Sequence, residues 1–313
     1  MALGTYHQTT TTADKFIPEI WSDEVVATYK KNLVLANLIK KLSFKGKKGD
    51  TLHIPKPGRG NASAKAAGSQ VTLVTDTASE IQVKIDQHWE YSILIEDIVE
   101  TQALASMRQF YTDDAGYALA RKVDSMLLQL GRGVNGGDGT AAYTGAYAGA
   151  DGTTAYVAGS NNQSALTDAA IRRSIQRLDD SDVPMDGRYF IIPPSSRNTL
   201  MGLARYTEQA FVGEAGSMNT IRNGEIGNLY GVPVFTTTNA DTPNDANDGS
   251  GTAQPARICL MGHKDSMVLV EQQGVRSQTQ YKQEYLGTLF TADTLYGVAE
   301  LRDYSSVALA VPA

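Results

Sequence analysis

The sequence predicts an elongated α+β protein. Three stretches carry this prediction: a long strand near 81–95, a long helix near 96–130, and an α/β segment from about residue 160 that gives way to a β-rich end. About 15 strand residues and about 34 helix residues would each span roughly 50 Å. Both lengths exceed the width of a small compact domain, so we expect a flat, extended molecule.

The long strand is predicted from strict alternation. Apolar side chains occupy most odd positions between residues 81 and 95, and polar side chains occupy most even positions, including His88. A period of two is typical of a strand with one buried face. A two-stranded arm of this length is marginally stable alone in water. Part of its apolar face is therefore expected to cover a second copy, and the candidate interface residues on it are Ile81, Val83, Ile85, Trp89 and Tyr91.

An exposed basic loop is predicted before this strand. A short strand at 51–54 ends at Pro55 and Pro57, which restrict it to a sheet edge. Residues 58–68 are small, glycine-rich and basic, which is typical of an exposed loop tip. Its two basic residues, Arg59 and Lys65, complete the set of candidate interface residues.

Two helices are predicted on either side of this strand-and-loop region. Apolar residues recur at helical spacing over 22–42, with Lys40 and Lys41 in the last turn, where positive charge suits the helix dipole. The second helix is predicted from about Glu96 to Leu130, and Gly131 is expected to stop it. Its apolar positions are Leu104, Met107, Tyr111, Ala115, Leu119, Val123, Met126, Leu127 and Leu130.

The second half of the chain predicts a conventional α/β arrangement after a Gly/Ala/Thr/Tyr-rich loop at 131–159. Thr167 is expected to cap a helix, and a buried strand follows at 189–192. The pair Pro193–Pro194 and a cap at Ser195 or Ser196 are expected to open a helix that ends near 203. Further strands are predicted at 232–235, 257–261, 266–271, 275–285, 296–302 and 307–311.

The charge distribution argues against a dedicated nucleic-acid-binding protein. Residues 1–60 contain ten Lys/Arg and five Asp/Glu, a net charge of +5, which leaves −11 for the remainder of a chain whose total is −6. Phosphate contacts need a basic surface, so an acidic body does not favour DNA binding as the main function. The basic N-terminal part suggests an acidic contact, either packaged DNA or the body of a neighbouring copy.

The sequence contains no convincing catalytic, cofactor or metal motif. The pattern G-x-G-x-x-G at Gly131, Gly133 and Gly136 follows a helix and enters a loop, whereas a dinucleotide site needs it between a strand and a helix. The four histidines lack metal-ligand spacing, and neither a nucleophile elbow nor a Walker A sequence occurs. Cys259 is expected to be a small buried hydrophobic residue. No stretch approaches the length of a membrane span.

Four phrases, taken in order, resemble a known family. They are FIPEIW at 16–21, GDTLHIP at 49–55, RYFIIPP at 188–194 and GNLYGVPV at 227–234. Together with the order of a basic arm, a long hairpin loop, a long helix, an α/β lobe and a β-rich return, they resemble the Hong Kong 97-like fold of tailed-phage major capsid proteins. The resemblance covers nearly the whole chain from about residue 14.

This resemblance implies a division of the chain into regions. Residues 1–45 would form the N-terminal arm and first helix, and 46–95 the extended loop that lies across a neighbour in the same capsomer. Residues 96–131 and 257–299 would form the peripheral domain with its long spine helix. Residues 132–256 and 300–313 would form the axial domain.

The resemblance also implies a function and its partners. The chain would be a structural protein with no catalytic role and no cofactor, assembling in the host cytoplasm into hexamers and pentamers of an icosahedral virion that encloses double-stranded DNA. Partners would be other copies, a separate scaffolding protein, a portal and, in some systems, a decoration protein, with only weak nonspecific DNA contact and no membrane. Some relatives cross-link their subunits through a lysine, but nothing beside Lys65 predicts such a link.

Three alternatives remain open from the sequence. An encapsulin-like nanocompartment shell protein shares the fold, although its start would be helical and the start of this chain is threonine-rich. A tail tube subunit would be mostly β, which the long helix argues against. An unrecognised α+β hydrolase would need a pocket with converging polar groups and perturbed titrating residues.

Overall fold

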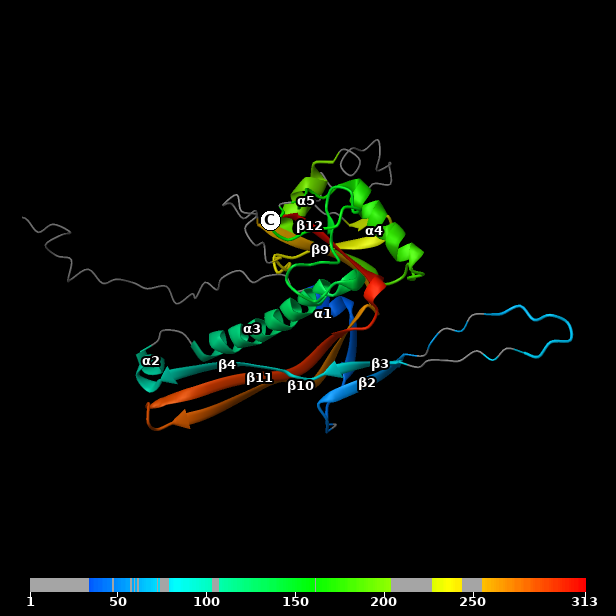
Figure 1. Cartoon of the computed structure of the whole chain (residues 1–313). Helices are drawn as coiled ribbons and strands as arrows, with labels where there is room; N and C mark the ends of the chain where they lie inside the picture. Colours follow the sequence, from blue (N-terminus) through cyan, green and yellow to red (C-terminus); the bar gives the residue numbers. More distant parts are fainter. Residues whose placement is uncertain are drawn as a thin grey trace, which may run out of the picture.

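Two β-sheets and one long helix organise the chain (Figure 1). The computed structural model describes residues 34–46, 48–56, 58, 60, 62–71, 73, 79–102, 107–160, 162–203, 227–243 and 255–313. The side chains of 100–102 and 107–109 are not among them. In the described part, no helix has both the length and the apolar character that crossing a membrane requires.

The first sheet has four long strands in the order β1-β10-β11-β4. β10 (Met267–Lys282) and β11 (Gly287–Glu300) form an antiparallel hairpin, and β4 (Gln87–Glu96) pairs antiparallel with β11 from Gly287 to Tyr296. β1 (Lys40–Ser43) pairs parallel with the start of β10. The short helix α2 (Asp97–Gln102) follows β4 at the distal end of this sheet.

The helix α3 (Met107–Gln129) runs along this sheet and continues into the second lobe. Its middle packs Ala115 and Leu119 against Phe290 and Ala292 of β11. Its last residues, among them Leu127, enter a second hydrophobic core that lies beneath the other sheet. One helix of 23 residues, roughly 35 Å long at 1.5 Å per residue, therefore connects both lobes.

The second sheet has six strands in the order β5-β12-β9-β6-β8-β7. Its central strands β6 (Arg188–Ile192), β9 (Ala256–His263) and β12 (Ser306–Pro312) are buried along almost their whole length, which explains their continuous apolar runs. Helices α4 (Asp168–Asp180) and α5 (Pro194–Met201) contribute to the core on one face. Shorter strands complete the edges: β5 (Tyr147–Ala148), β7 (Asn228–Leu229) and β8 (Val232–Thr236).

A two-stranded arm leaves the body at the end of the first sheet opposite α2 (Figure 1). β2 (Thr51–Lys56) and β3 (Ser79–Lys84) pair antiparallel from Thr51↔Lys84 to Lys56↔Ser79. The described residues between them, 58, 60, 62–71 and 73, are all exposed. In Figure 1 the coloured part of this loop stretches well away from both sheets.

The predicted first helix is wrong at its C-terminal end. Residues 22–33 lie outside the described part, α1 comprises only Leu35–Leu38, and Lys40 and Lys41 belong to β1. Parallel pairing with β10, at Lys40↔Val268 and Lys41↔Leu269, replaces the expected last helical turn. Local helical spacing does not reveal a strand partner that is more than two hundred residues away.

The single long strand is also wrong, because Ile85 and Asp86 interrupt it. β3 pairs with β2, whereas β4 pairs with β11, so the two halves have different partners. The chain crosses β11 beside Gly297, where an added Cβ would clash with the carbonyl oxygen of Lys84. The alternation of apolar and polar residues continues across the break, because the odd-numbered side chains between residues 81 and 95 are buried or half-buried in both β3 and β4. The sequence pattern therefore does not reveal the break.

Two smaller expectations are corrected as well. The predicted long helix is described as α2 and α3, and residues 103–106 between them lie outside the described part. No serine caps α5: Pro193 occupies the N-cap position, and Ser195 Oγ donates instead to the carbonyl oxygen of Pro312 at 2.9 Å. β9, expected in the sheet beside the long helix, pairs with β6 and β12 in the six-stranded sheet. The expected cap at Thr167 is confirmed, since its side chain accepts from the N–H of Ala170.

Candidate assembly surface

Two of the sequence-predicted interface residues belong to the core of the subunit. Val83 is fully buried and Ile85 is 7% exposed. Both pack with Phe44, Val268 and Val270 between the arm and the four-stranded sheet. Neither side chain is available to a second copy, and this part of the prediction is wrong. Ile81, opposite Ile54 on β2, is half-buried at the root of the arm.

Trp89 and Tyr91 pack mainly against their own long helix. Both are half-buried beside the cluster that includes Leu119 of α3. The Lys122 ammonium lies 4.1 Å from the centre of the Trp89 ring, and the Tyr91 hydroxyl lies 3.4 Å from a carboxylate oxygen of Asp114. The apolar face of β4 therefore packs on α3 of the same subunit, and contact of the half-buried Trp89 and Tyr91 with a second copy stays a prediction.

The exposed part of the arm carries the strongest unburied apolar signal among the described residues. Leu73 is 90% exposed and Val71 is 68% exposed. Lys65 is exposed in the same loop, whereas Arg59 lies outside the described residues. Side chains of this size gain about 1.5–3 kcal/mol each on full burial, so a partner surface is expected to cover them.

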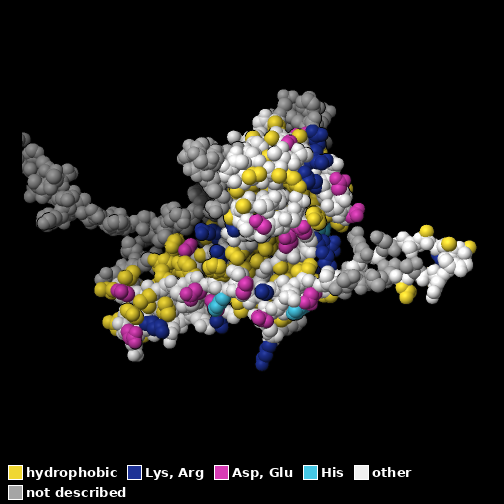
Figure 2. Space-filling view, in the orientation of Figure 1, with side chains coloured by type: hydrophobic (Ala, Val, Ile, Leu, Met, Phe, Trp, Pro, Cys, Tyr) yellow, Lys and Arg dark blue, Asp and Glu magenta, His cyan; other side chains and the backbone are white. Residues whose placement is uncertain are grey.

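A second exposed apolar patch lies at the opposite, distal end of the four-stranded sheet. We call it the tip patch; Figure 2 shows hydrophobic side chains gathered at this end of the molecule. The Tyr281 hydroxyl donates to Asp97 at 2.8 Å, and the Asp97 N–H donates to the Leu286 carbonyl at 3.0 Å, which ties the β10–β11 turn to α2. Its members are Leu94, Ile98, Val99, Tyr281, Tyr285 and Leu286.

The tip patch has no counterpart among the residues predicted from the sequence. The residues lie near 95 and near 283 in the sequence, and the pairing of β4 with β11, which begins at Gly287 and Glu96, brings them together. The one local signal is the run Tyr285-Leu286-Gly287, two large apolar residues in a hairpin turn, where polar residues are usual.

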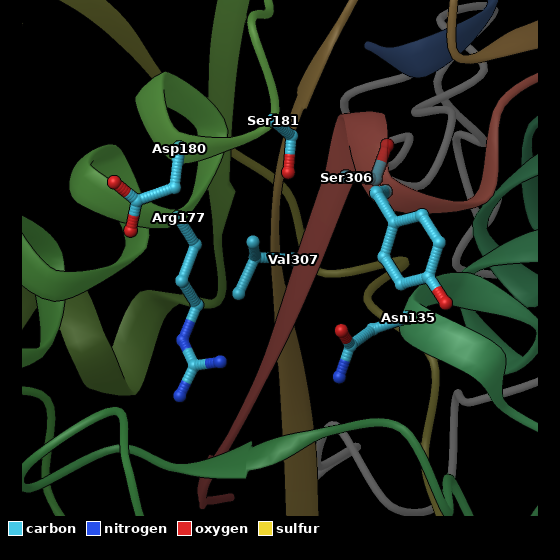
Figure 3. Close-up of a pocket in the computed structure, with 7 residues that line it drawn as sticks. Asn135, Arg177, Asp180, Ser181, Ser306 and Val307 are labelled. Carbon is cyan, nitrogen blue, oxygen red and sulfur yellow. The ribbon is translucent and has the colours of Figure 1, made fainter.

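Among the described residues, a small cavity is lined mostly by polar side chains (Figure 3). Its volume is about 210 Å³, below the usual range of roughly 300–1,000 Å³ for small-molecule sites. Arg177 is already engaged, since its guanidinium donates to the Tyr147 hydroxyl at 2.6 Å and to the Gly152 carbonyl at 3.0 Å. The other lining residues are Asn135, Asp180, Ser181, Tyr304, Ser306 and Val307, and this lining contains no histidine or cysteine to activate a nucleophile.

The described residues also offer no cluster of three or more His, Cys, Asp or Glu side chains suited to a metal ion. The glycines at 131, 133 and 136 lie in the short 3-10 helices η2 (Leu130–Arg132) and η3 (Val134–Gly136) and the residue between them, directly after α3. That position lacks the preceding strand a dinucleotide site requires. The G-x-G-x-x-G pattern is therefore part of a joint between elements.

Cys259 is an inert core residue, as expected. It is fully buried in β9, and its Sγ lies 3.4 Å from the Ser196 hydroxyl. Burial raises the pKa of the Cys259 thiol to about 12. We predict no reaction with a colorimetric disulfide reagent at pH 8 in the native protein and one thiol per chain after denaturation. Rapid native reaction would show that β9 opens readily.

The fold and its exposed surfaces together define a class of protein: a subunit with a long projecting arm and two apolar patches at opposite ends, built to contact other chains. The comparisons with known proteins agree. The family model described as "Phage capsid protein" matches residues 35–303, and the chain belongs to that family. No curated protein sequence matches the chain significantly.

Solved capsid structures share the fold over nearly the whole chain. A chain from Mycobacterium phage Che8 is 21% identical with a TM-score of 0.70, and the match covers 94% of this chain and 97% of that one. The head structure of Helicobacter pylori bacteriophage KHP40 gives a TM-score of 0.74 at 10% identity, with 99% of both chains covered. The capsid of Cyanophage P-SCSP1u gives 0.72 at 19% identity, with 99% and 96% covered.

These findings confirm the Hong Kong 97-like fold and support a major capsid protein, a virion component that assembles with copies of itself into a shell. They give no support to a nanocompartment shell or a hydrolase.

Proposed function

We propose that this major capsid protein closes its shell through the projecting arm, which lies across a neighbouring copy in the same capsomer. The observation that carries this proposal is the exposure of Val71 and Leu73 on a loop that touches little of its own subunit. Lys65 adds a positive charge that suits the acidic body of a neighbour. Each copy thus both gives an arm and receives one.

Such a contact is heterologous, because the arm of one copy meets a different surface of the next. Heterologous contacts close into rings when the rotation between copies is correct, and we infer hexamers and pentamers on an icosahedral lattice. Each contact can be weak, since every subunit makes several of them and multivalency stabilises the shell.

The region assignments follow the two sheets. We infer that the four-stranded sheet with α3 is the peripheral domain and that the six-stranded sheet is the axial domain. The boundary in the C-terminal half then falls between β9 and β10, after His263, instead of before residue 257. The arm comprises β2, β3 and the loop between them.

The remaining roles belong to the same proposal. We infer that assembly occurs in the host cytoplasm with a separate scaffolding protein and a portal, that a decoration protein binds in some systems, and that the protein performs no catalysis. Double-stranded DNA is enclosed with weak nonspecific contact, since a net charge of −6 limits attraction to phosphate.

Electron microscopy with light scattering of the purified chain tests this proposal. We expect closed shells, or rings of five and six copies, from the natural sequence. The double variant Val71→Ser and Leu73→Ser is expected to remain folded and to lower the yield of shells at least about tenfold, because each subunit loses the apolar part of its arm contact.

The matched control is Val157→Ser, which removes an apolar side chain of 56% exposure from a loop of the six-stranded lobe. It should assemble as the natural chain does. Normal shells from the double variant, or a monomer under every condition for the natural chain, would contradict the proposed role of the arm.

A further inference from the structure

Two acidic side chains lie where the chain passes from one sheet to the other. Glu300 ends β11, and Asp303 begins the 3-10 helix η4 (Asp303–Ser305), which leads directly into β12 (Figure 1). This crossing lies against η2 and η3 at the end of α3. The three segments form the joint between the lobes, defined here as residues 130–136 and 300–305.

Glu300 is an unsatisfied carboxyl group within this joint. Its Oε1 is buried and has no hydrogen-bond partner among the described residues. Its Oε2 lies so close to η2 that a Cβ added at Gly133 would approach it to 2.9 Å. The absence of a side chain at Gly133 therefore makes room for the carboxyl group, yet no donor meets it there.

The charged groups around Glu300 do not neutralise it. Asp303 adds a negative charge, and its Oδ1 accepts the N–H of Gly136 at 2.8 Å. Arg132 of η2 is committed to Asp241, with Nε–Oδ2 at 2.8 Å and Nη2–Oδ1 at 3.2 Å.

The strand and turn on the other side of Glu300 also place no positive charge against its carboxylate. The facing residue on β10 is the apolar Met267. In the adjoining turn, Lys264 packs on Gly187 and Asp265 lies 3.8 Å from His263. Arg302, on the crossing itself, is exposed.

We propose that Glu300 makes the joint between the two lobes responsive to protons. The joint is tight when Glu300 is neutral and loosens when Glu300 is ionised, because a half-buried anion beside Asp303 gains hydration when the crossing separates from η2 and η3. When the joint loosens, the two lobes move more freely relative to one another, and neither sheet changes.

The direction follows from the titration of this group. Burial, with a smaller contribution from the charge of Asp303, raises the pKa of Glu300 from 4.5 to about 7. A raised acid pKa means that the closed joint is favoured at low pH and that this preference is lost as pH rises from about 4.5 to about 7. With the open joint at the ordinary pKa, linkage makes opening about tenfold more favourable at pH 8 than at pH 6.

Hydrogen exchange of the full chain measures this directly, with rates divided by the intrinsic exchange rate at each pH. Protection of peptides covering 130–136 and 300–305 should fall about tenfold between pH 6 and pH 8, whereas peptides from α4 should not change. In Glu300→Gln, which keeps the shape and removes the charge, the joint should keep its protection at both pH values.

Glu284→Gln is the matched control, since Glu284 is an exposed carboxylate in the β10–β11 turn, and it should behave as the natural chain does. The proposal is wrong if the natural chain shows no pH change at the joint or if Glu300→Gln retains it. Should Glu300→Gln fail to fold, Asp303→Asn provides the second test. It removes one neighbouring charge and should move the midpoint to lower pH, so an unchanged midpoint would overturn the proposal.

Discussion

Deleting residues 58–68 is expected to leave the subunit folded and to prevent closed shells from forming. The described residues of this segment are all exposed, and the ladder of the arm strands β2 and β3 ends at Lys56 and Ser79, outside the deleted segment. A shorter loop also costs slightly less entropy to close. The melting temperature should therefore change by no more than about 2 °C, as for other surface changes.

Assembly should respond in the opposite way, because the deletion shortens the reach of the arm and removes Lys65. Sedimentation and electron microscopy should show a fall in shell yield of at least about tenfold, since every subunit loses the same contact and the losses multiply over the shell. Replacement of 58–68 by glycine and serine at equal length is the control. This replacement preserves the length of the arm but removes its side chains. A partial recovery of shell yield would therefore show how much of the loss comes from arm length and how much from side-chain contacts.

Two outcomes would contradict this expectation. Closed shells of normal size from the deletion variant would show that the arm is dispensable. A large loss of thermal stability would show that the loop supports the fold of its own subunit, although its described residues are exposed.

The elements that the sequence predicted well are those whose signals are local. The run from Arg188 to Pro194 combines a continuous apolar strand with two prolines that end it, and the structure forms β6 and α5 there. Thr167 caps α4 because its hydroxyl accepts an N–H only three residues along the chain. Such signals involve neighbours in sequence, so a single chain is enough to read them.

The elements that failed depend on partners far away in the chain. Lys40 and Lys41 fit a helix by spacing but form a strand because the edge of β10 is open to them. Burial of Val83 likewise depends on Phe44 and on β10, which a count of alternating residues cannot reveal. Alternation shows that a face is covered, but it does not show whether the cover is the same chain or another copy.

Whether an apolar face is covered by its own chain or by another copy determines which residues form the candidate assembly surface. The length of the predicted hairpin favours contact of part of its apolar face with a neighbour, yet α3 covers the apolar face of β4 within the subunit. The unburied apolar residues are instead in the arm loop and in the tip patch, where short, irregular stretches give no periodicity. Sequence patterns therefore predicted the exposed loop at 58–68, whose described residues are all exposed, but the predicted extended loop of 46–95 includes β4, which belongs to the four-stranded sheet.

Replacing Asp124 by alanine should destabilise the subunit most among the single changes considered, because this carboxylate connects three separate parts of the fold. Asp124 lies on α3 and is fully buried. Its Oδ1 accepts the N–H groups of Leu35 and Ala36 at 2.9 and 3.3 Å, which holds α1 against the long helix. Its Oδ2 accepts the Asn239 amide at 3.2 Å from the loop after β8.

The expected cost of Asp124→Ala is about 3 kcal/mol of unfolding free energy, because buried donors lose their acceptor and a cavity remains. That corresponds to a fall of about 6–10 °C in melting temperature, measurable by calorimetry. Asp124→Asn keeps one acceptor oxygen for α1 but turns a second donor toward Asn239, so it should cost less, about 1 kcal/mol. Equal losses in the two variants would show that packing, and not hydrogen bonding to Asp124, joins α1 and the β8 loop to the long helix.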